Sequence, residues 1–129
     1  MSSADTHDRN RQSAQAISNA ITKLQHDHYG RGPESVRTIV GYDHIITFLE
    51  NTFMPVERTL LDAGEIDAVR ETRLAFQRAM EHRFINTVEE ITSLKVRVFL
   101  SQVSLDPDIS VEVFVLERGE TELAPEGVA

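Results

Sequence analysis

The sequence predicts a single α+β domain in which helices pack on a four-stranded antiparallel sheet. Two stretches place apolar residues three and four positions apart, which is the period of a helix with one buried face, and Pro55 followed by Glu57 is typical of the start of a third, short helix. Two other stretches each hold a pair of β-branched runs that alternate with period two around a turn, which is typical of a β-hairpin. The predicted order is α-β-β-α-α-β-β, and 129 residues fit one such domain.

The first helix is predicted over residues 13–28, and Gly30 stands where a helix-ending residue with positive φ is expected. The polar, aperiodic start of the chain predicts a disordered tail over residues 1–12. A mixture of Gly, Pro and acidic residues predicts a second disordered tail over residues 118–129. The folded domain is therefore expected to span residues 13–117. The apolar stripe of the first helix consists of Ala14, Ile17, Ile21 and Leu24.

The two hairpins are predicted from their turns and their alternation. The runs SVRTIV and HIITFLE lie on either side of Gly41, and they predict a hairpin over residues 35–50. The runs LKVRVFLSQV and DISVEVFVLE lie on either side of Pro107 and predict the second hairpin.

Two further helices are predicted between the hairpins. Pro55 favours the first position of a short helix over residues 55–63, and Glu57 is placed to accept a hydrogen bond from the backbone amide that precedes the helix. A long three-and-four rhythm of apolar residues predicts a core helix over residues 66–92, with Arg73 as the one charged residue on its apolar stripe.

Both faces of the second hairpin carry apolar residues. The alternation predicts that Phe99, Phe114 and Leu116 share one face. A sheet with one face in water normally has polar residues there, so either the first helix or a second copy of the chain must cover the additional apolar face. We expect a homodimer with these three residues at its interface. The opposite face is expected to hold Val96, Val98, Leu100, Val111, Val113 and Val115.

The composition excludes several classes of function. A net charge of −8 opposes binding to a nucleic-acid backbone, and the absence of cysteine excludes disulfides and thiolate chemistry. No apolar run is long enough to span a membrane, and the chain does not begin with a secretory signal, so a cytoplasmic protein is expected. His26 and His28 are two positions apart on a helix, which is poor spacing for a metal. No motif of a catalytic site is present, so we expect no cofactor, no metal and no enzymatic activity.

Two features are candidates for a binding site for an anion or a partner. Gly30, Arg31 and Gly32 form a loop in which backbone amides and a guanidinium can approach carboxylate, phosphate or bicarbonate oxygens. The alternative is a simple turn, because phosphate-binding loops normally lead into a helix, and this loop leads into a strand. Arg73 needs either a bound anion or a carboxylate such as Glu57, because a bare charge on an apolar stripe is costly.

Five ordered blocks carry a resemblance to a known family: GRGPESVR, MPVERTLLDAG, VRETRLAFQRAM, VEEITSLKVRVFLSQVSLDPD and VEVFVLE. Over residues 14–117 the chain resembles the MpsC domain, a small component associated with a sodium-translocating, membrane-potential-generating system. The sequence departs from the family at Met54, where Thr is usual before the short helix, and at Ser93, where Gly is common after the long helix.

The resemblance implies a cytoplasmic accessory or regulatory domain that acts with an integral-membrane subunit in ion or bicarbonate transport, and that reaches the membrane through this partner. The alternative is a small-anion sensor that signals to a soluble partner. None of the positions shared with the family is an established catalytic residue.

Overall fold

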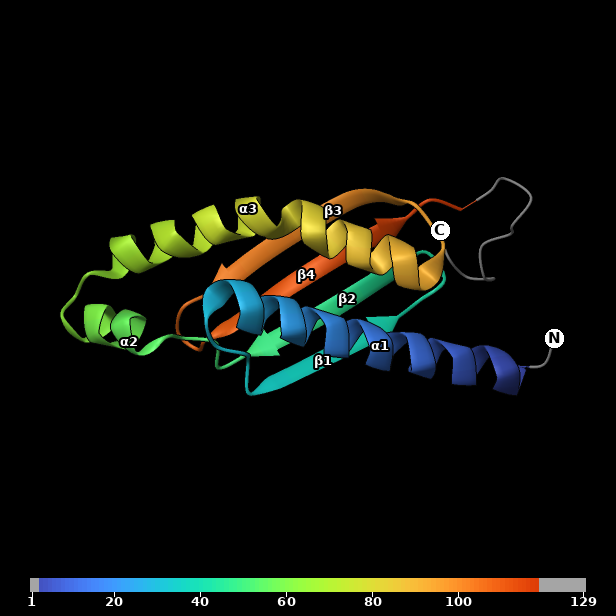
Figure 1. The fold of residues 1–129 in the computed structure, drawn as a ribbon, viewed down its shortest axis with the longest axis horizontal. Helices are drawn as coiled ribbons and strands as arrows, with labels where there is room; N and C mark the ends of the chain where they lie inside the picture. Colours follow the sequence, from blue (N-terminus) through green and yellow to red (C-terminus); the bar gives the residue numbers. More distant parts are fainter. Residues whose placement is uncertain (1–2, 119–129) are drawn as a thin grey trace.

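The computed structural model describes residues 3–118, which form two layers (Figure 1). Helices α1 and α3 run in opposite directions across one face of a four-stranded sheet, and α2 lies beyond the strand ends (Figure 1). All neighbouring strands are antiparallel, in the order β1-β2-β4-β3. The predicted fold class and element order are confirmed. The elements are α1 (Ser3–Tyr29), β1 (Ser35–Val40), β2 (His44–Glu50), α2 (Pro55–Asp62), α3 (Ile66–Thr92), β3 (Val96–Ser104) and β4 (Ile109–Leu116).

Helix α1 begins ten residues earlier than predicted. The disordered tail predicted over residues 1–12 is wrong from residue 3 onward, because these residues continue the helix. Residues 5–9 are exposed because this part of α1 extends past the sheet (Figure 1), so polar side chains suit it and no apolar stripe is needed. Arg11 pairs with Asp8 at 2.8 Å along the helix surface.

The domain also includes Arg118, which had been assigned to the C-terminal tail. Its Nε donates to the carbonyl oxygen of Tyr42 at 2.7 Å, and its guanidinium lies 4.7 Å from the centre of the Tyr42 ring. The rest of the predicted C-terminal tail, 119–129, lies outside the described residues.

The helix ends follow from local chemistry. Gly30 and Gly64 have φ angles of 91° and 82°, the left-handed conformation that glycine adopts without a steric penalty. Ser93 takes the same role after α3 with a φ of 60°, which is less favourable for a residue with a Cβ atom. At the start of α2, the Glu57 carboxylate accepts from the Met54 amide at 2.8 Å, as predicted.

The core lies between the two long helices and the sheet. The ring of Phe99 is 5.1 Å from that of Phe114 and 6.4 Å from that of Phe84, so one aromatic cluster joins β3, β4 and α3. Burial of each large apolar side chain contributes about 1.5–3 kcal/mol. The buried core is made of Ile17, Ile21, Ile45, Leu49, Met80, Phe84, Val88, Phe114 and Leu116.

The structure corrects the predicted dimer interface. Phe114 and Leu116 are 0% and 4% exposed, and Phe99 packs against the same core beneath the helices. A β-bulge between Val96 and Val98 changes the register, so Val96 turns toward the helices while Val98 turns away from them. Both faces of this hairpin carry apolar residues, so the alternation does not show which face the helices cover, and the prediction took the core face for the uncovered one.

Candidate functional site

A buried polar network joins α3 to the rest of the fold at the end of the sheet. The guanidinium of Arg73, which is 4% exposed, holds the Glu57 carboxylate with two hydrogen bonds, from Nε at 2.8 Å and from Nη2 at 3.1 Å. Its Nη1 donates to the Thr52 hydroxyl and lies 3.9 Å from Asp108 Oδ1. The expectation that a carboxylate or an anion satisfies Arg73 is confirmed, and the partner is Glu57.

Asp108 organises the backbone between β2 and α2. Its Oδ2 accepts from the amides of Thr52 at 2.7 Å and Phe53 at 2.8 Å, and its Oδ1 accepts from the Thr52 hydroxyl at 3.1 Å. The chain makes a tight bend here, with Asn51 at a φ of 57°. Asp108 thus supplies acceptors for two buried amides that neither a helix nor a strand satisfies.

Aromatic rings enclose the ion pair. The guanidinium of Arg73 lies 4.6 Å from the centre of the Phe53 ring and 5.0 Å from that of Tyr29, whose hydroxyl donates to Glu57. Burial of Glu57 favours its neutral form, but hydrogen bonds from Arg73, Tyr29 and Met54 outweigh burial and lower the pKa of Glu57 below its usual value. Burial and the bond to Glu57 raise the pKa of Tyr29. The network is therefore ionised, and each of the three guanidinium nitrogens of Arg73 donates to an acceptor within the chain.

The predicted anion loop packs against this network. The Gly30 amide donates to the His26 carbonyl at 3.1 Å, and a Cβ atom on Gly30 would come within 3.3 Å of Met54 Cε. Arg31 Nη1 donates to the Phe53 carbonyl at 2.7 Å. Arg31 and Arg73 thus contact the same segment, one through its backbone and one through its ring. This arrangement matches the turn interpretation better than an open anion cradle.

The surroundings of Gly32 do not indicate an anion-binding loop either. A Cβ atom there would lie 3.8 Å from atoms of Thr22 and His26, which is ordinary contact distance. The second donor group of Arg31, Nη2, lies 3.4 Å from Glu34, whose other oxygen accepts from Asn51 at 3.0 Å. The arginine predicted to hold an anion therefore joins two loops of the chain.

Sequence reasoning did not find Tyr29, Thr52 or Asp108. Asp108 follows Pro107 at the turn of the second hairpin. Nothing local distinguishes an aspartate of a turn from one whose carboxylate accepts hydrogen bonds from a loop distant in sequence. The short pattern of Pro55 and Glu57 did indicate where the carboxylate of the network would lie.

The sheet face opposite the helices carries many apolar residues. No helix within residues 3–118 lies across it (Figure 1), and Leu100 is 57% exposed. On β1 and β2 its charged or titratable side chains are Arg37, His44 and Glu50, and the Arg37 guanidinium lies 4.7 Å from the centre of the Phe48 ring. Arg97 of β3 is exposed at the bulge beside Val98. We call this surface the open face. Its apolar residues are Ile39, Ile46, Phe48, Val98, Leu100, Ile109, Val111, Val113 and Val115.

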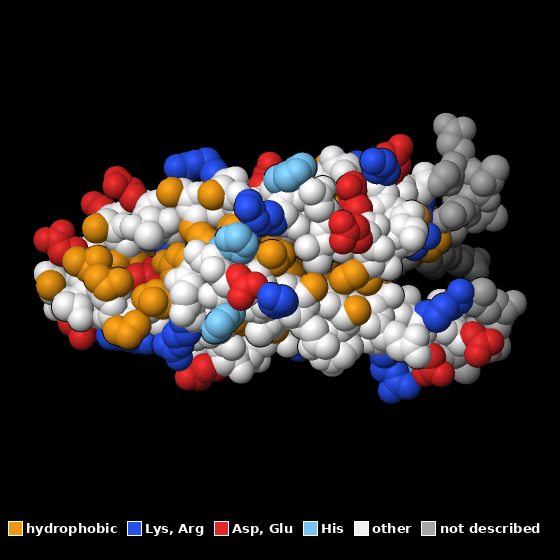
Figure 2. All heavy atoms as spheres, in the orientation of Figure 1, with side chains coloured by type: hydrophobic (Ala, Val, Ile, Leu, Met, Phe, Trp, Pro, Cys, Tyr) orange, Lys and Arg blue, Asp and Glu red, His pale blue; other side chains and the backbone are white. Residues whose placement is uncertain are grey.

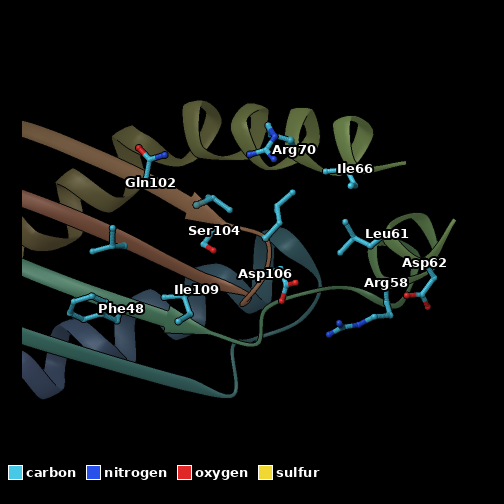
Figure 3. Close-up of a pocket in the computed structure, with 13 residues that line it drawn as sticks. Phe48, Arg58, Leu61, Asp62, Ile66, Arg70, Gln102, Ser104, Asp106 and Ile109 are labelled. Atoms are coloured by element: carbon cyan, nitrogen blue, oxygen red, sulfur yellow. The ribbon is translucent and has the colours of Figure 1, made fainter. Parts of the chain in front are cut away.

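At one end the open face continues into a groove of about 1010 Å³. Figure 3 shows Leu61 of α2 and Ile66 of α3 on one side of this groove, and Phe48 and Ile109 of the sheet on the other. On the helix side, apolar side chains also gather at the end formed by α2 and the start of α3 (Figure 2). Val56 and Ile66 are exposed there.

One buried carboxylate has no counter-charge. Glu112 lies under the helices, and burial raises its pKa to about 8. A hydrogen bond from Ser101 opposes this rise in the pKa of Glu112 without cancelling it, and Glu112 Oε2 and Gln77 Nε2 are buried without a hydrogen-bond partner. A small cavity of about 20 Å³ beside Gln77 and Glu112 has room for one water molecule.

The described residues contain neither a metal-binding cluster nor a membrane span. Among residues 3–118, no three His, Cys, Asp or Glu side chains are grouped so that they could hold a metal ion. No helix in this part of the chain is both long enough and apolar enough to cross a bilayer.

Comparison with known proteins identifies the family. Residues 9–118 match the family described as Na⁺-translocating membrane potential-generating system (MpsC). The chain belongs to the MpsC family. It is also 30% identical over 101 residues to the uncharacterized protein YbcI of Bacillus subtilis (strain 168). The aligned residues make up 78% of this chain and 82% of YbcI. No solved structure matches this MpsC chain.

Proposed function

We propose that this MpsC protein is a non-enzymatic accessory domain that acts by protein contact within a membrane-potential-generating ion or bicarbonate transport system. The family description names a translocating system and no chemical reaction. On this proposal the protein works on the cytoplasmic side of the membrane and reaches it through an integral-membrane subunit.

The observation that carries the proposal is the exposed apolar end formed by α2 and the start of α3. Val56 and Ile66 are 62% and 47% exposed there, next to the groove lined by Leu61 (Figures 2 and 3). Exposed apolar groups gathered at one place favour a protein contact over solvent. The buried groups of the Arg73 network are paired with one another, which supports a structural role for them over catalysis. The groove itself is also lined by the charged residues Arg58, Asp62, Arg70 and Asp106.

The charge of the chain favours a protein partner over direct contact with lipid. A net charge of −8 is repelled by the anionic cytoplasmic leaflet, which instead attracts clusters of Lys and Arg. A subunit with apolar surface outside the bilayer would supply the contact that the lipid does not.

The test is complementation of a strain that lacks the gene. Deletion is expected to lower the membrane potential, measured with a voltage-sensitive dye, and the wild-type gene is expected to restore it. Val56→Glu is expected to fail, because it places a charge in the apolar contact. The control Leu74→Glu adds the same charge to an exposed leucine of α3 away from the α2 end, and it is expected to restore the potential. An unchanged potential in the deletion strain would refute the proposed function.

The small-anion sensor has less support. Arg31 is bound to the Phe53 carbonyl and Arg73 to Glu57, so both arginines that would hold an anion already have acceptors within the chain.

A further inference from the structure

The open face is built like an interior surface. Across the middle of the sheet, Ile39 of β1 pairs with Ile46 of β2, which pairs with Val113 of β4, which pairs with Leu100 of β3. This row crosses all four strands without a polar residue. The rows on either side of it include Val98, Phe48 and Val111, whereas polar groups lie toward the margins.

The size of the face is that of a specific interface. Four strands about 4.8 Å apart, with four rows of same-face residues about 6.8 Å apart, span about 500 Å² of sheet, of which the apolar residues cover roughly 300 Å². A monomer rarely exposes a contiguous apolar patch of more than a few hundred Å². Two such faces in contact bury about 1,000 Å², which is the lower bound for a stable association. Side chains that project from each sheet add further area to the contact.

The charge of the face favours a second copy of the same chain as its occupant. The chain carries a net charge of −8, so most surfaces of two copies repel each other. The open face is the exception, because its Arg37 and Glu50 cancel and its centre is uncharged. Two identical sheets also share the same right-handed twist, and such sheets stack face to face at about −30° with their side chains interdigitated.

We propose that two copies of the chain associate through their open faces, which gives a four-layer dimer with the sheets inside and the helices outside. The dimer does not rest on the proposed function, which is carried by the exposed Val56 and Ile66 at the α2 end. The two surfaces meet at the groove, where Phe48, Ile109 and Val111 of the open face lie opposite Leu61. The interface residues differ from those predicted from the sequence, because Phe99, Phe114 and Leu116 lie beneath the helices.

Two matched pairs of variants test the dimer. Leu100→Glu and Val98→Glu place a charge on the open face, where the two residues are 57% and 39% exposed. Leu74→Glu and Val56→Glu place the same charge on the helices, in residues that are 43% and 62% exposed. All four positions are exposed in the single chain, so each variant is expected to fold, and circular dichroism checks this.

Sedimentation at micromolar concentration is expected to give the wild type twice the single-chain mass of 14.6 kDa. The two helix variants are expected to match it. Each open-face variant is expected to weaken association by about 100-fold or more and to sediment as a single chain, because a charge buried in an apolar interface is costly.

Three results would overturn the proposal. One is a wild type that sediments as a single chain. Another is a dimer that persists in both open-face variants and is lost in a helix variant. The third is a single chain that binds uncharged lipid vesicles through the open face, which would identify a membrane as its occupant. A failed complementation test with a normal dimer would refute only the proposed function.

Discussion

Replacement of Glu112 by glutamine tests how the core holds a carboxyl group without a counter-charge. The side chain lies on β4 beneath the helices, its Oε2 has no partner, and burial raises its pKa to about 8. Glutamine has nearly the same shape and does not titrate. The change therefore removes the proton equilibrium while leaving the packing almost unaltered.

The expected magnitude follows from the difference between the folded and unfolded pKa values. Below pH 4.5 the carboxyl group is protonated in both states, and its full contribution to stability is present. As the pH rises from 4.5 toward 8, the unfolded chain releases the proton while the folded chain retains it, so stability is lost. At pH 7 the loss is about 3 kcal/mol, from about 1.4 kcal/mol per pH unit, and Glu112→Gln avoids it.

Urea denaturation at pH 4, 7 and 9 measures this effect. The gain in unfolding free energy from Glu112→Gln is expected to be near zero at pH 4, about 3 kcal/mol at pH 7, and no longer increasing above pH 8. Glu81→Gln, on the exposed surface of α3, is the control and is expected to show a much smaller dependence on pH. A gain for Glu112→Gln that is equal at pH 4 and pH 7 would show that the folded protein already holds Glu112 ionised.

Three further changes test the network, the loop and a helix end. Arg73→Leu is expected to lower the free energy of unfolding by about 3–5 kcal/mol, because it leaves Glu57 buried and unpaired; a loss below about 1 kcal/mol would mean that the pair is open to water. Arg31→Ala is expected to cost about 1 kcal/mol, through loss of the hydrogen bond to Phe53, with no heat in calorimetric titration of the wild type with bicarbonate or phosphate. Heat in the wild type that disappears in Arg31→Ala would restore the anion site. Ser93→Gly is expected to raise stability by about 1 kcal/mol in urea denaturation, because it relieves the positive φ, and an unchanged midpoint would contradict this.

Much of the fold could be predicted from local patterns, and the errors have local causes. Helix α3 and the hairpins were found because an apolar period reports burial against a core. The start of α1 was missed because a helix that extends beyond the sheet buries nothing and leaves no apolar period. The faces of β3 were misassigned at its start because one extra residue near Arg97 reverses the alternation, and a bulge has no clear mark in sequence.

The site was predicted in part, because a charge on the apolar stripe at Arg73 needs a partner and Glu57 was one of the two alternatives. Pro55 and Glu57 are two positions apart and indicated a capped helix that proved to hold the carboxylate of the network. The contacts of Arg73 with Thr52 and Asp108 cross 21 and 35 positions, and only tertiary packing brings them together. The loop sequence offers no acceptor for Arg31, so a bound anion was one interpretation. Its acceptor, the Phe53 carbonyl, lies 22 positions away and cannot be inferred from the loop itself.

Solvent protection of a single cysteine on the open face tests most directly whether that face is buried between two copies. The chain contains no cysteine, so Leu100→Cys and Leu74→Cys each introduce one reactive thiol. At micromolar concentration the thiol of Leu100→Cys is expected to react with a maleimide more slowly than that of Leu74→Cys, and dilution of the protein is expected to remove the difference. Equal rates at every protein concentration would show that the open face is exposed to water, and would contradict the dimer.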